Sequence, residues 1–305
     1  MTKNIKNKIK RKILFKWLIL FVGLLLFINL VVLGYFSFVS FPPKNSLRIV
    51  FFDIGQGDAA LIQTPKGYNI LIDGGPEKNI IHKLDKYIPI NNRRIDLMIL
   101  THFGLDHLTG LVEVLERYPV KRVVSNGLKD NTFAALEWKK IIEQKNIPQQ
   151  AIDATQRIVL EDGDGEIKMD FFWPIQNQIK RLKGDDNFTS LVLKLTYKNN
   201  SLLFTGDAIT EAEEEIIKSG VNLKADVLKV GHHGSKYSSG LEFLKLVEPQ
   251  YGVISVGENA FGHPSLRVLN NLKEVGAEIL RTDELGDIIF LGDGEKIKLT
   301  NKIYK

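Results

Sequence analysis

Thr101-His102-Phe103-Gly104-Leu105-Asp106-His107 is the stretch around which the predicted fold is organised. It follows the apolar run Ile95–Leu100, which predicts a buried strand, and it precedes Leu108–Arg117, whose apolar spacing predicts a helix. The end of a strand therefore places two imidazoles and a carboxylate in one turn. Neutral imidazole and ionised carboxylate are ligands that zinc, manganese and iron accept. The alternative is that Asp106 only caps the helix and both histidines are ordinary loop residues.

Two further carboxylates have the same kind of position. Asp73 ends a predicted strand, and Asp207 lies between a predicted strand, Ser201–Thr205, and a predicted helix, Thr210–Lys218. In open sheets the loops that follow separate strands meet at one edge. Carboxylates grouped there would repel one another without a cation between them. The placement of Asp73, Asp106 and Asp207 therefore predicts a metal site, although each of them alone could be a turn residue.

The histidines follow the same rule. Five of the six lie in predicted loops just after a strand or before a helix, and only His82 lies inside a helical pattern. The five are His102, His107, His232, His233 and His263. Solvated loop histidines are the alternative. Because the chain has no cysteine, any metal site must use nitrogen and oxygen ligands.

The amino terminus differs in composition from the rest. Residues 1–16 carry seven Lys and Arg and no acid, and residues 17–41 carry no charge. The apolar run is long enough to cross the ~30 Å hydrocarbon core of a bilayer as a helix. We interpret 17–41 as an uncleaved, single-pass signal anchor, with the basic tail cytoplasmic and everything after Pro42 extracytoplasmic. A long cleavable signal peptide is the alternative. Residues 42–46 read as a linker.

Charge and composition exclude two classes of protein. The formal charge of +5 is due to the basic tail, because the rest has 34 basic and 36 acidic residues, so a globally basic nucleic-acid binder is excluded. The Gly55 and Gly57 loop lacks the third glycine and the following helix of a dinucleotide site, so we expect no nucleotide cofactor. The absence of cysteine fits an extracytoplasmic domain without disulfides.

The order of these motifs resembles the metallo-β-lactamase superfamily: a strand ending in Asp73, then His102-x-x-x-Asp106-His107, Thr205-Gly206-Asp207 and Gly231–Ser235. More narrowly, residues 47–291 are similar to the carboxy-terminal domain of the ComEC competence family. The segments that carry this similarity are Asp53–Asp58, Leu71–Gly75, Ser190–Leu193, Leu203–Asp207, His232–Ser235 and Phe261–Ser265. The resemblance implies that 47–305 is one α/β domain, an αββα sandwich, and the run 17–41 places one transmembrane helix before it.

The resemblance also implies a set of metal ligands. A first ion would keep His102 and the bridging Asp207; a second would keep Asp106, His107, Asp207 and either His232 or His233. The chain departs from the family pattern at Gly104, where a ligand is expected, and it has no histidine between His107 and His232. We therefore predict one divalent ion, Zn or Mn, rather than two.

The expected activity is metal-dependent hydrolysis of a phosphodiester, with DNA as a possible substrate and competence-type proteins as possible partners. Asp73 and Asp106 would orient a ligand or the attacking water. Ser235, Lys236 and His263 are candidates to contact the phosphate or to protonate the leaving oxygen. Two alternatives stay open: an inactive module of the same fold that binds DNA or cell-wall polymer, and a phosphoesterase of wall polymers.

Overall fold

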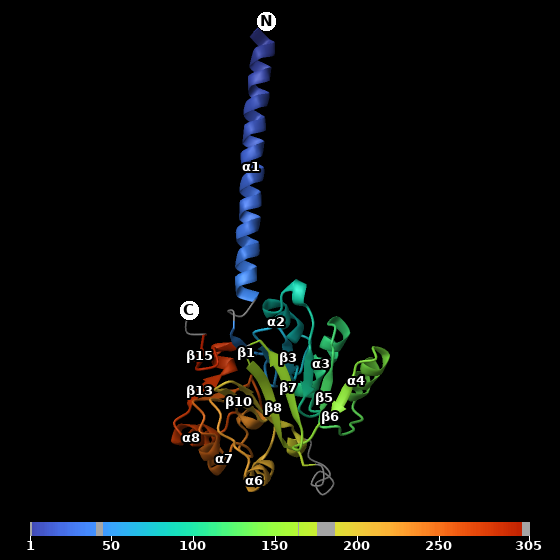
Figure 1. Ribbon diagram of the computed structural model, residues 1–305, viewed down its shortest axis with the longest axis vertical. Helices are drawn as coiled ribbons and strands as arrows, with labels where there is room; N and C mark the ends of the chain where they lie inside the picture. The colour runs from blue at the N-terminus through green and yellow to red at the C-terminus, as the bar shows by residue number, and fades with distance from the viewer. Residues whose placement is uncertain (1, 41–44, 164, 176–186, 301–305) are drawn as a thin grey trace. The chain divides into compact units, whose positions relative to one another are not determined.

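The computed structural model describes residues 2–40, 45–163, 165–175 and 187–300 (Figure 1). The chain separates into two compact units, residues 1–41 and 42–305. Most of the predicted linker 42–46 and the last five residues, 301–305, lie outside the described residues.

The first unit is a single helix, α1 (Thr2–Ser40). Within it, Arg11–Val31 is long and apolar enough to cross a membrane, which makes α1 a candidate membrane span. At 1.5 Å per residue these 21 residues extend about 32 Å. The helix begins earlier than the predicted anchor because no Gly or Pro interrupts residues 2–22, so the basic tail continues the same helix.

The second unit contains two sheets, an eight-stranded and a seven-stranded one among the described residues. The first has the order β15 (Ile297–Leu299), β14 (Ile288–Gly292), β1 (Leu47–Phe51), β2 (Ala60–Gln63), β3 (Asn69–Ile72), β4 (Leu97–Leu100), β5 (Val123–Ser125), β6 (Gln149–Ala151). The second has the order β13 (Glu278–Arg281), β12 (Tyr251–Ile254), β11 (Val227–Lys229), β10 (Asn200–Phe204), β9 (Val192–Tyr197), β8 (Gly165–Trp173), β7 (Arg157–Asp162).

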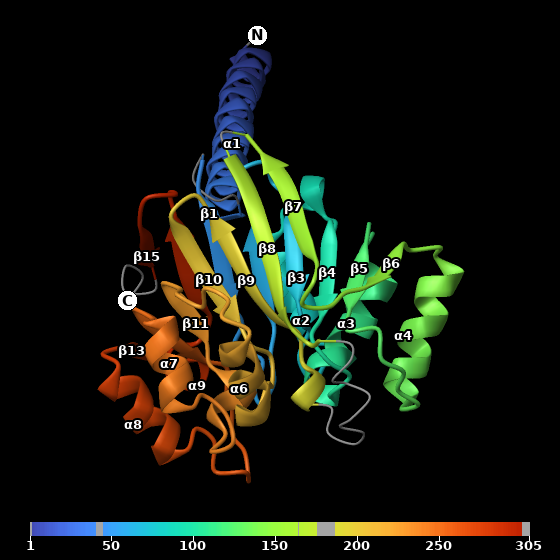
Figure 2. The same cartoon turned by 60° about the horizontal axis from the view of Figure 1, so that its bottom comes forward.

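Helices pack against the outer face of each sheet (Figure 2). The first sheet carries α2 (Ile80–Tyr87), α3 (Leu105–Arg117) and α4 (Phe133–Gln144). The second carries α6 (Thr210–Lys218), α7 (Leu241–Val247) and α8 (Leu266–Glu274). The remaining short helices are α9 (Thr282–Leu285) and the 3-10 turns η1 (Ile90–Asn92), η2 (Asn187–Thr189) and η3 (Gly231–Gly234).

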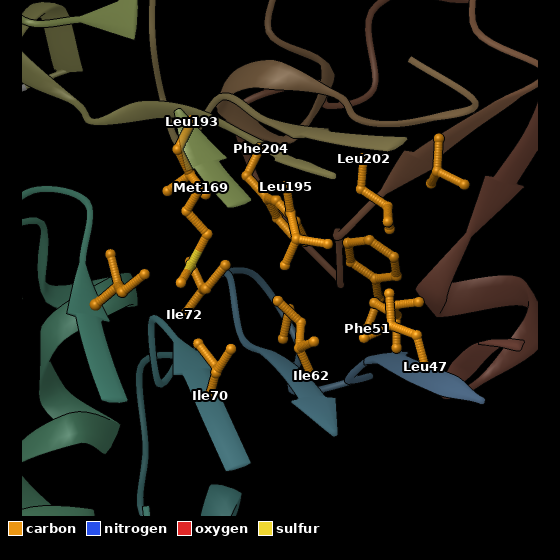
Figure 3. Close-up of a cluster of buried hydrophobic side chains, with 14 of the residues drawn as sticks. Leu47, Phe51, Ile62, Ile70, Ile72, Met169, Leu193, Leu195, Leu202 and Phe204 are labelled. Carbon is orange, nitrogen blue, oxygen red and sulfur yellow. The ribbon is translucent and has the colours of Figure 1, made fainter. Parts of the chain in front are cut away.

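Alternation along the strands explains this layering. In β1, Leu47, Ile49 and Phe51 point into the core between the sheets, whereas Val50 points to the helices on the other face. Figure 3 shows the side chains that meet between the sheets, among them Phe51 of the first sheet and Phe204 of the second, whose ring centroids lie 5.7 Å apart. The inner strands β1, β3, β4 and β11 are therefore buried on both faces, and the predicted αββα fold is confirmed.

The structure also corrects the predicted helix that begins at Leu108. Helix α3 begins at Leu105, so Asp106 and His107 lie in its first turn and not in a loop. Asp106 favours this earlier start because a carboxylate complements the positive end of the helix dipole. The sequence did not predict the edge strands β6, which is mostly polar and exposed, and β7, which alternates between exposed and partly buried residues.

Candidate metal centre

Four parts of the chain deliver the predicted site residues to one edge of the sandwich. Strand β3 ends before Asp73, and β4 ends before Thr101 and His102. Strands β3 and β4 are parallel, as are β10 and β11, so each pair ends on the same side. Asp207 follows β10, and the turn η3 after β11 carries the paired histidines. Parallel strand ends thus explain why residues more than a hundred positions apart meet.

Asp106, His107, Asp207 and His233 form a compact group, here called the four-residue cluster. One ligand atom from each lies within 4.8 Å of all the others. His107 Nε2 lies 3.2 Å from Asp207 Oδ1, and His233 Nε2 lies 3.1 Å from Asp106 Oδ2. The other two imidazole–carboxylate distances are 3.5 Å from His233 Nε2 to Asp207 Oδ2 and 3.9 Å from His107 Nε2 to Asp106 Oδ2.

These distances fit one cation. Ligands at about 2.1 Å from a tetrahedral ion lie about 3.4 Å from each other, which is close to the observed spacings. His107 Nε2 and Asp207 Oδ1 are buried, and neither makes a hydrogen bond of good geometry to the described residues. Buried polar atoms rarely lack a partner unless an ion or water satisfies them. The four-residue cluster is therefore suited to hold a divalent metal ion.

The non-ligating side of His107 is fixed by Asp73. Asp73 Oδ2 lies 2.8 Å from His107 Nδ1 and accepts a hydrogen bond of 2.7 Å from Thr101 Oγ1. Asp73 Oδ1 accepts from the Thr101 amide at 2.8 Å. A carboxylate that holds Nδ1 of a histidine leaves Nε2 free for a metal. Asp73 thus lies behind the four-residue cluster and holds His107.

Sequence reasoning missed a second support, built from Asp58 and Lys229. Lys229 Nζ lies 2.5 Å from Asp58 Oδ2, and both side chains are buried. Asp58 Oδ1 lies 3.4 Å from His233 Nδ1, and the Ser255 carbonyl lies 2.9 Å from the same nitrogen. A single lysine inside the apolar strand Ala225–Val230 was the available signal, because a buried ammonium requires a partner.

Asp58, Asp73 and His107 form a second group whose ligand atoms lie within 4.8 Å. The ammonium of Lys229 already contacts Asp58, so a positive charge compensates one of the two carboxylates of this group. Burial alone would raise the pKa of Asp58, but Lys229, His233 and His107 outweigh it and hold that pKa below its usual range. The second group is therefore a support and not a separate ion site.

Charges within the four-residue cluster compensate one another. Burial lowers the pKa of His107 and His233, but the Asp207 charge and the neighbouring carboxylates raise both well above the usual value. Burial would raise the pKa of Asp207, yet His233 and His107 hold it well below the usual range. The carboxylates therefore stay ionised and attract positive charge, which protons or a metal ion can supply.

His102 is placed beside the cluster and not in it. Its Nδ1 lies 3.0 Å from Ser190 Oγ, and burial, followed by the charge of His107, lowers its pKa to about 3. A Cβ added at Gly104 would lie 2.5 Å from His102 Nε2. The imidazole of His102 thus occupies the space next to Gly104, and a side chain at position 104 would require this ring to move.

The remaining predicted residues lie around the cluster. Of the paired histidines, His233 belongs to it, whereas His232 Nε2 lies 3.7 Å from Asp207 Oδ2. The His263 ring lies 5.5 Å from the His232 ring. Ser235 is buried, and its Oγ accepts a hydrogen bond from the Tyr237 amide. Lys236 Nζ lies 5.0 Å from the centre of the Tyr237 ring.

Comparison with known proteins agrees with this geometry. The sequence model of the metallo-beta-lactamase superfamily matches residues 52–258. The chain is 32% identical over 259 residues to ComE operon protein 3 of Bacillus subtilis, covering 79% of this chain and 32% of that protein. It is 30% identical over 270 residues to competence protein ComA of Neisseria gonorrhoeae, covering 86% and 35%. The chain thus spans about a third of the length of these relatives.

A solved structure shares the fold. The metallo-beta-lactamase fold protein YhfI from Bacillus subtilis superposes with a TM-score of 0.53 at 14% identity, over 81% of this chain and 100% of that one. Identity this low supports the architecture alone. The described fold, with its two sheets and outer helices, is therefore shared beyond the range of sequence similarity.

Proposed function

Because this chain belongs to the metallo-β-lactamase superfamily, whose members are generally metal-dependent hydrolases, we propose that it hydrolyses phosphodiesters, with DNA as the substrate, in a competence-related role. The observation that carries the proposal is the four-residue cluster, in which two imidazoles and two carboxylates converge on one position. Relatives named for competence support the choice of DNA. Proteins of the competence type are the proposed partners.

The proposed ligands are Asp106, His107, Asp207 and His233, and they hold one Zn or Mn ion. His102 lies outside the four-residue cluster, with its Nδ1 next to Ser190 Oγ and its Nε2 next to Gly104, which offers no ligand atom. His232 remains available for substrate or for a weak additional contact. An ion at this position would supply a Lewis acid for a phosphate oxygen and for a water molecule.

Other side chains have proposed roles toward the substrate. Asp73 positions His107 through the 2.8 Å contact, and Asp106 both ligates and orients the attacking water. His263 is the proposed proton donor to the leaving oxygen, because its ring lies beside His232 at the open side of the cluster. Ser235 is proposed to stabilise the phosphate through the backbone turn in which it lies, and Lys236 through its positive charge.

We further propose that α1 anchors the protein by one span with the hydrolase unit outside the cell. The seven basic residues among positions 1–16 support this orientation through the positive-inside rule. The chain has no cysteine, so Lys273→Cys, at an exposed position on α8, creates a single labelling site. A membrane-impermeant maleimide should label this variant in intact cells. Labelling only after lysis would reverse the proposed orientation.

Hydrolysis of bis(p-nitrophenyl) phosphate by the metal-loaded full chain tests the activity. We expect turnover with Mn²⁺ or Zn²⁺ that Asp207→Ala abolishes and Asp283→Ala leaves unchanged, because Asp283 is an exposed carboxylate on α9 that pairs with Arg281 of β13. A folded, metal-loaded chain that cleaves no phosphodiester would overturn the proposal. Retention of DNA without cleavage, unaffected by Asp207→Ala, would indicate a binding module. Cleavage of teichoic-acid fragments but not DNA would indicate a wall phosphoesterase.

A further inference from the structure

An exposed aromatic ring lies close to the metal centre. Phe261, in the loop between β12 and α8, is 73% exposed. Its ring lies 5.7 Å from that of His263, with the two planes at 30°. The His263 ring lies 5.5 Å from that of His232, whose Nε2 lies 3.7 Å from Asp207 Oδ2. Three neighbouring rings therefore lead from the four-residue cluster to solvent.

The backbone that presents Phe261 is fixed by Asn259. Its Oδ1 accepts hydrogen bonds from the amides of Phe261, at 3.1 Å, and His263, at 3.0 Å. Its Nδ2 donates to the carbonyls of Gly257 and His263, both at 2.9 Å. One side chain thus uses two donors and two acceptor positions on this loop. The backbone that carries the ring is held in place before any ligand arrives, which lowers the entropic cost of binding.

Polar atoms along the same path lack partners. Nδ1 of His232 and Nδ1 of His263 are both buried and have no hydrogen-bond partner among the described residues. Buried ring nitrogens usually find a partner. Their position between Phe261 and the four-residue cluster indicates that a polar ligand or ordered water belongs there.

The neighbouring loop carries a second exposed ring. Tyr237 is 61% exposed, and Lys236 Nζ lies 5.0 Å from its centre. This loop contacts the one that carries Phe261, because the Ser265 amide donates to the Gly234 carbonyl at 2.8 Å. Exposed aromatic rings next to a cation match the pattern by which proteins hold single-stranded nucleic acid, with bases on rings and phosphates on charges.

We propose that Phe261 is a stacking site for an unpaired nucleobase next to the phosphodiester that is cleaved. The inference rests on the proposed phosphodiesterase function and narrows its substrate to single-stranded nucleic acid. A base inside a duplex has both faces covered by its neighbours, so it offers no face to Phe261. Phe261 is therefore a specificity-determining residue, and the phosphate lies toward His232 and His263.

The test uses the full chain in detergent, loaded with Mn²⁺. Its substrates are a single-stranded thymidine oligonucleotide, the same strand in a duplex, and a strand of equal length with abasic sugars. Phe261→Ala should raise KM for the base-containing single strand roughly 5- to 150-fold, the range that loss of one stacked base gives. Phe261→Trp should keep the parent KM. For the abasic strand, parent and Phe261→Ala should have equal KM.

Phe133→Ala is the matched control. Phe133 is 80% exposed on α4, which covers the opposite sheet from α8 (Figure 2). Truncating it should leave every KM unchanged. Because both side chains are exposed, neither substitution disturbs the core.

The outcomes separate the two proposals. Two results would exclude the stacking site while the hydrolase remains, provided that the parent cleaves the single strand. In the first, Phe261→Ala has the parent KM; in the second, its KM rises as much on the abasic strand as on the base-containing strand. If the parent cleaves no strand, a fluorescence anisotropy titration with the labelled thymidine oligonucleotide decides. Weaker binding by Phe261→Ala than by Phe133→Ala would retain the stacking site without the proposed activity, and equal binding would exclude it.

Discussion

Removing the charge of Lys229 should destabilise the protein more than any exposed substitution. In Lys229→Met, the Asp58 carboxylate keeps its buried position but loses the ammonium that lies 2.5 Å away. Both side chains of this pair are less than a tenth exposed, so solvent cannot replace the lost partner. Breaking one partner of such a pair typically costs about 3–5 kcal/mol. We expect the free energy of unfolding to fall by this amount at neutral pH.

The assay is urea unfolding of the metal-free full chain in detergent, followed through the buried Trp138 and Trp173. EDTA is needed because bound metal would add its own stabilisation. The midpoint should fall while the slope with urea stays constant. A matched double variant, Asp58→Asn with Lys229→Met, removes both charges and should recover most of the loss, since a neutral pair leaves no uncompensated charge.

Acid should reduce the difference in the free energy of unfolding between Lys229→Met and the parent. In the parent, the pKa of Asp58 is held below its usual range, so its stabilising contribution is present above about pH 4 and is lost as pH falls. In the variant, burial without Lys229 raises the pKa of Asp58 above its value in the parent. Protonation of Asp58 in acid then removes the cost of burying an uncompensated charge. A midpoint equal to that of the parent at pH 7, or a double variant as unstable as Lys229→Met, would refute this account of the pair.

Two further predictions concern helix α3 and the imidazoles of His107 and His233. Gly110→Ala should lower the free energy of unfolding by about 1–3 kcal/mol or more and weaken metal binding. The reason is that its Cβ would lie 1.9 Å from the Gly74 carbonyl oxygen and push away the helix that carries His107. Urea unfolding and metal titration check this prediction, and Thr109→Ala should show neither effect. The metal-free chain should be more stable at pH 6 than at pH 9. Despite burial, the Asp207 charge raises the pKa of His107 and His233. The stability gained from a raised pKa is complete below about pH 6.5 and is lost as pH rises through the pKa of the folded state. Equal urea midpoints at the two pH values would contradict the second prediction.

Much of the fold followed from patterns within single segments. The apolar strands that end before Asp73, His102 and Asp207 have strong local signals, and their carboxyl ends were predicted to meet. Edge strands such as β6, Gln149–Ala151, have no such signal, because pairing with a neighbour and not apolar alternation defines them. The start of α3 at Leu105 has only a weak local signal, the acidic Asp106 in its first turn.

The site was predicted only in part, for a similar reason. Residue types and strand ends were sufficient to propose Asp106, His107 and Asp207 together. Only the folded backbone distinguishes His233 from His232, because adjacent side chains diverge in the left-handed turn that holds them, at φ 53° and 48°. Asp58 and Lys229 were missed because they are far apart in the chain and support the ligands from behind.

The metal content of the purified full chain tests the central claim most directly. After equilibration with Mn²⁺ or Zn²⁺ and removal of excess ion, elemental analysis should give one equivalent per chain. Asp207→Asn should lose that ion, since Asp207 lies within 3.5 Å of both His107 Nε2 and His233 Nε2, whereas Asp283→Asn should retain it. Two equivalents, none, or an unchanged content in Asp207→Asn would contradict a single ion held by the four-residue cluster.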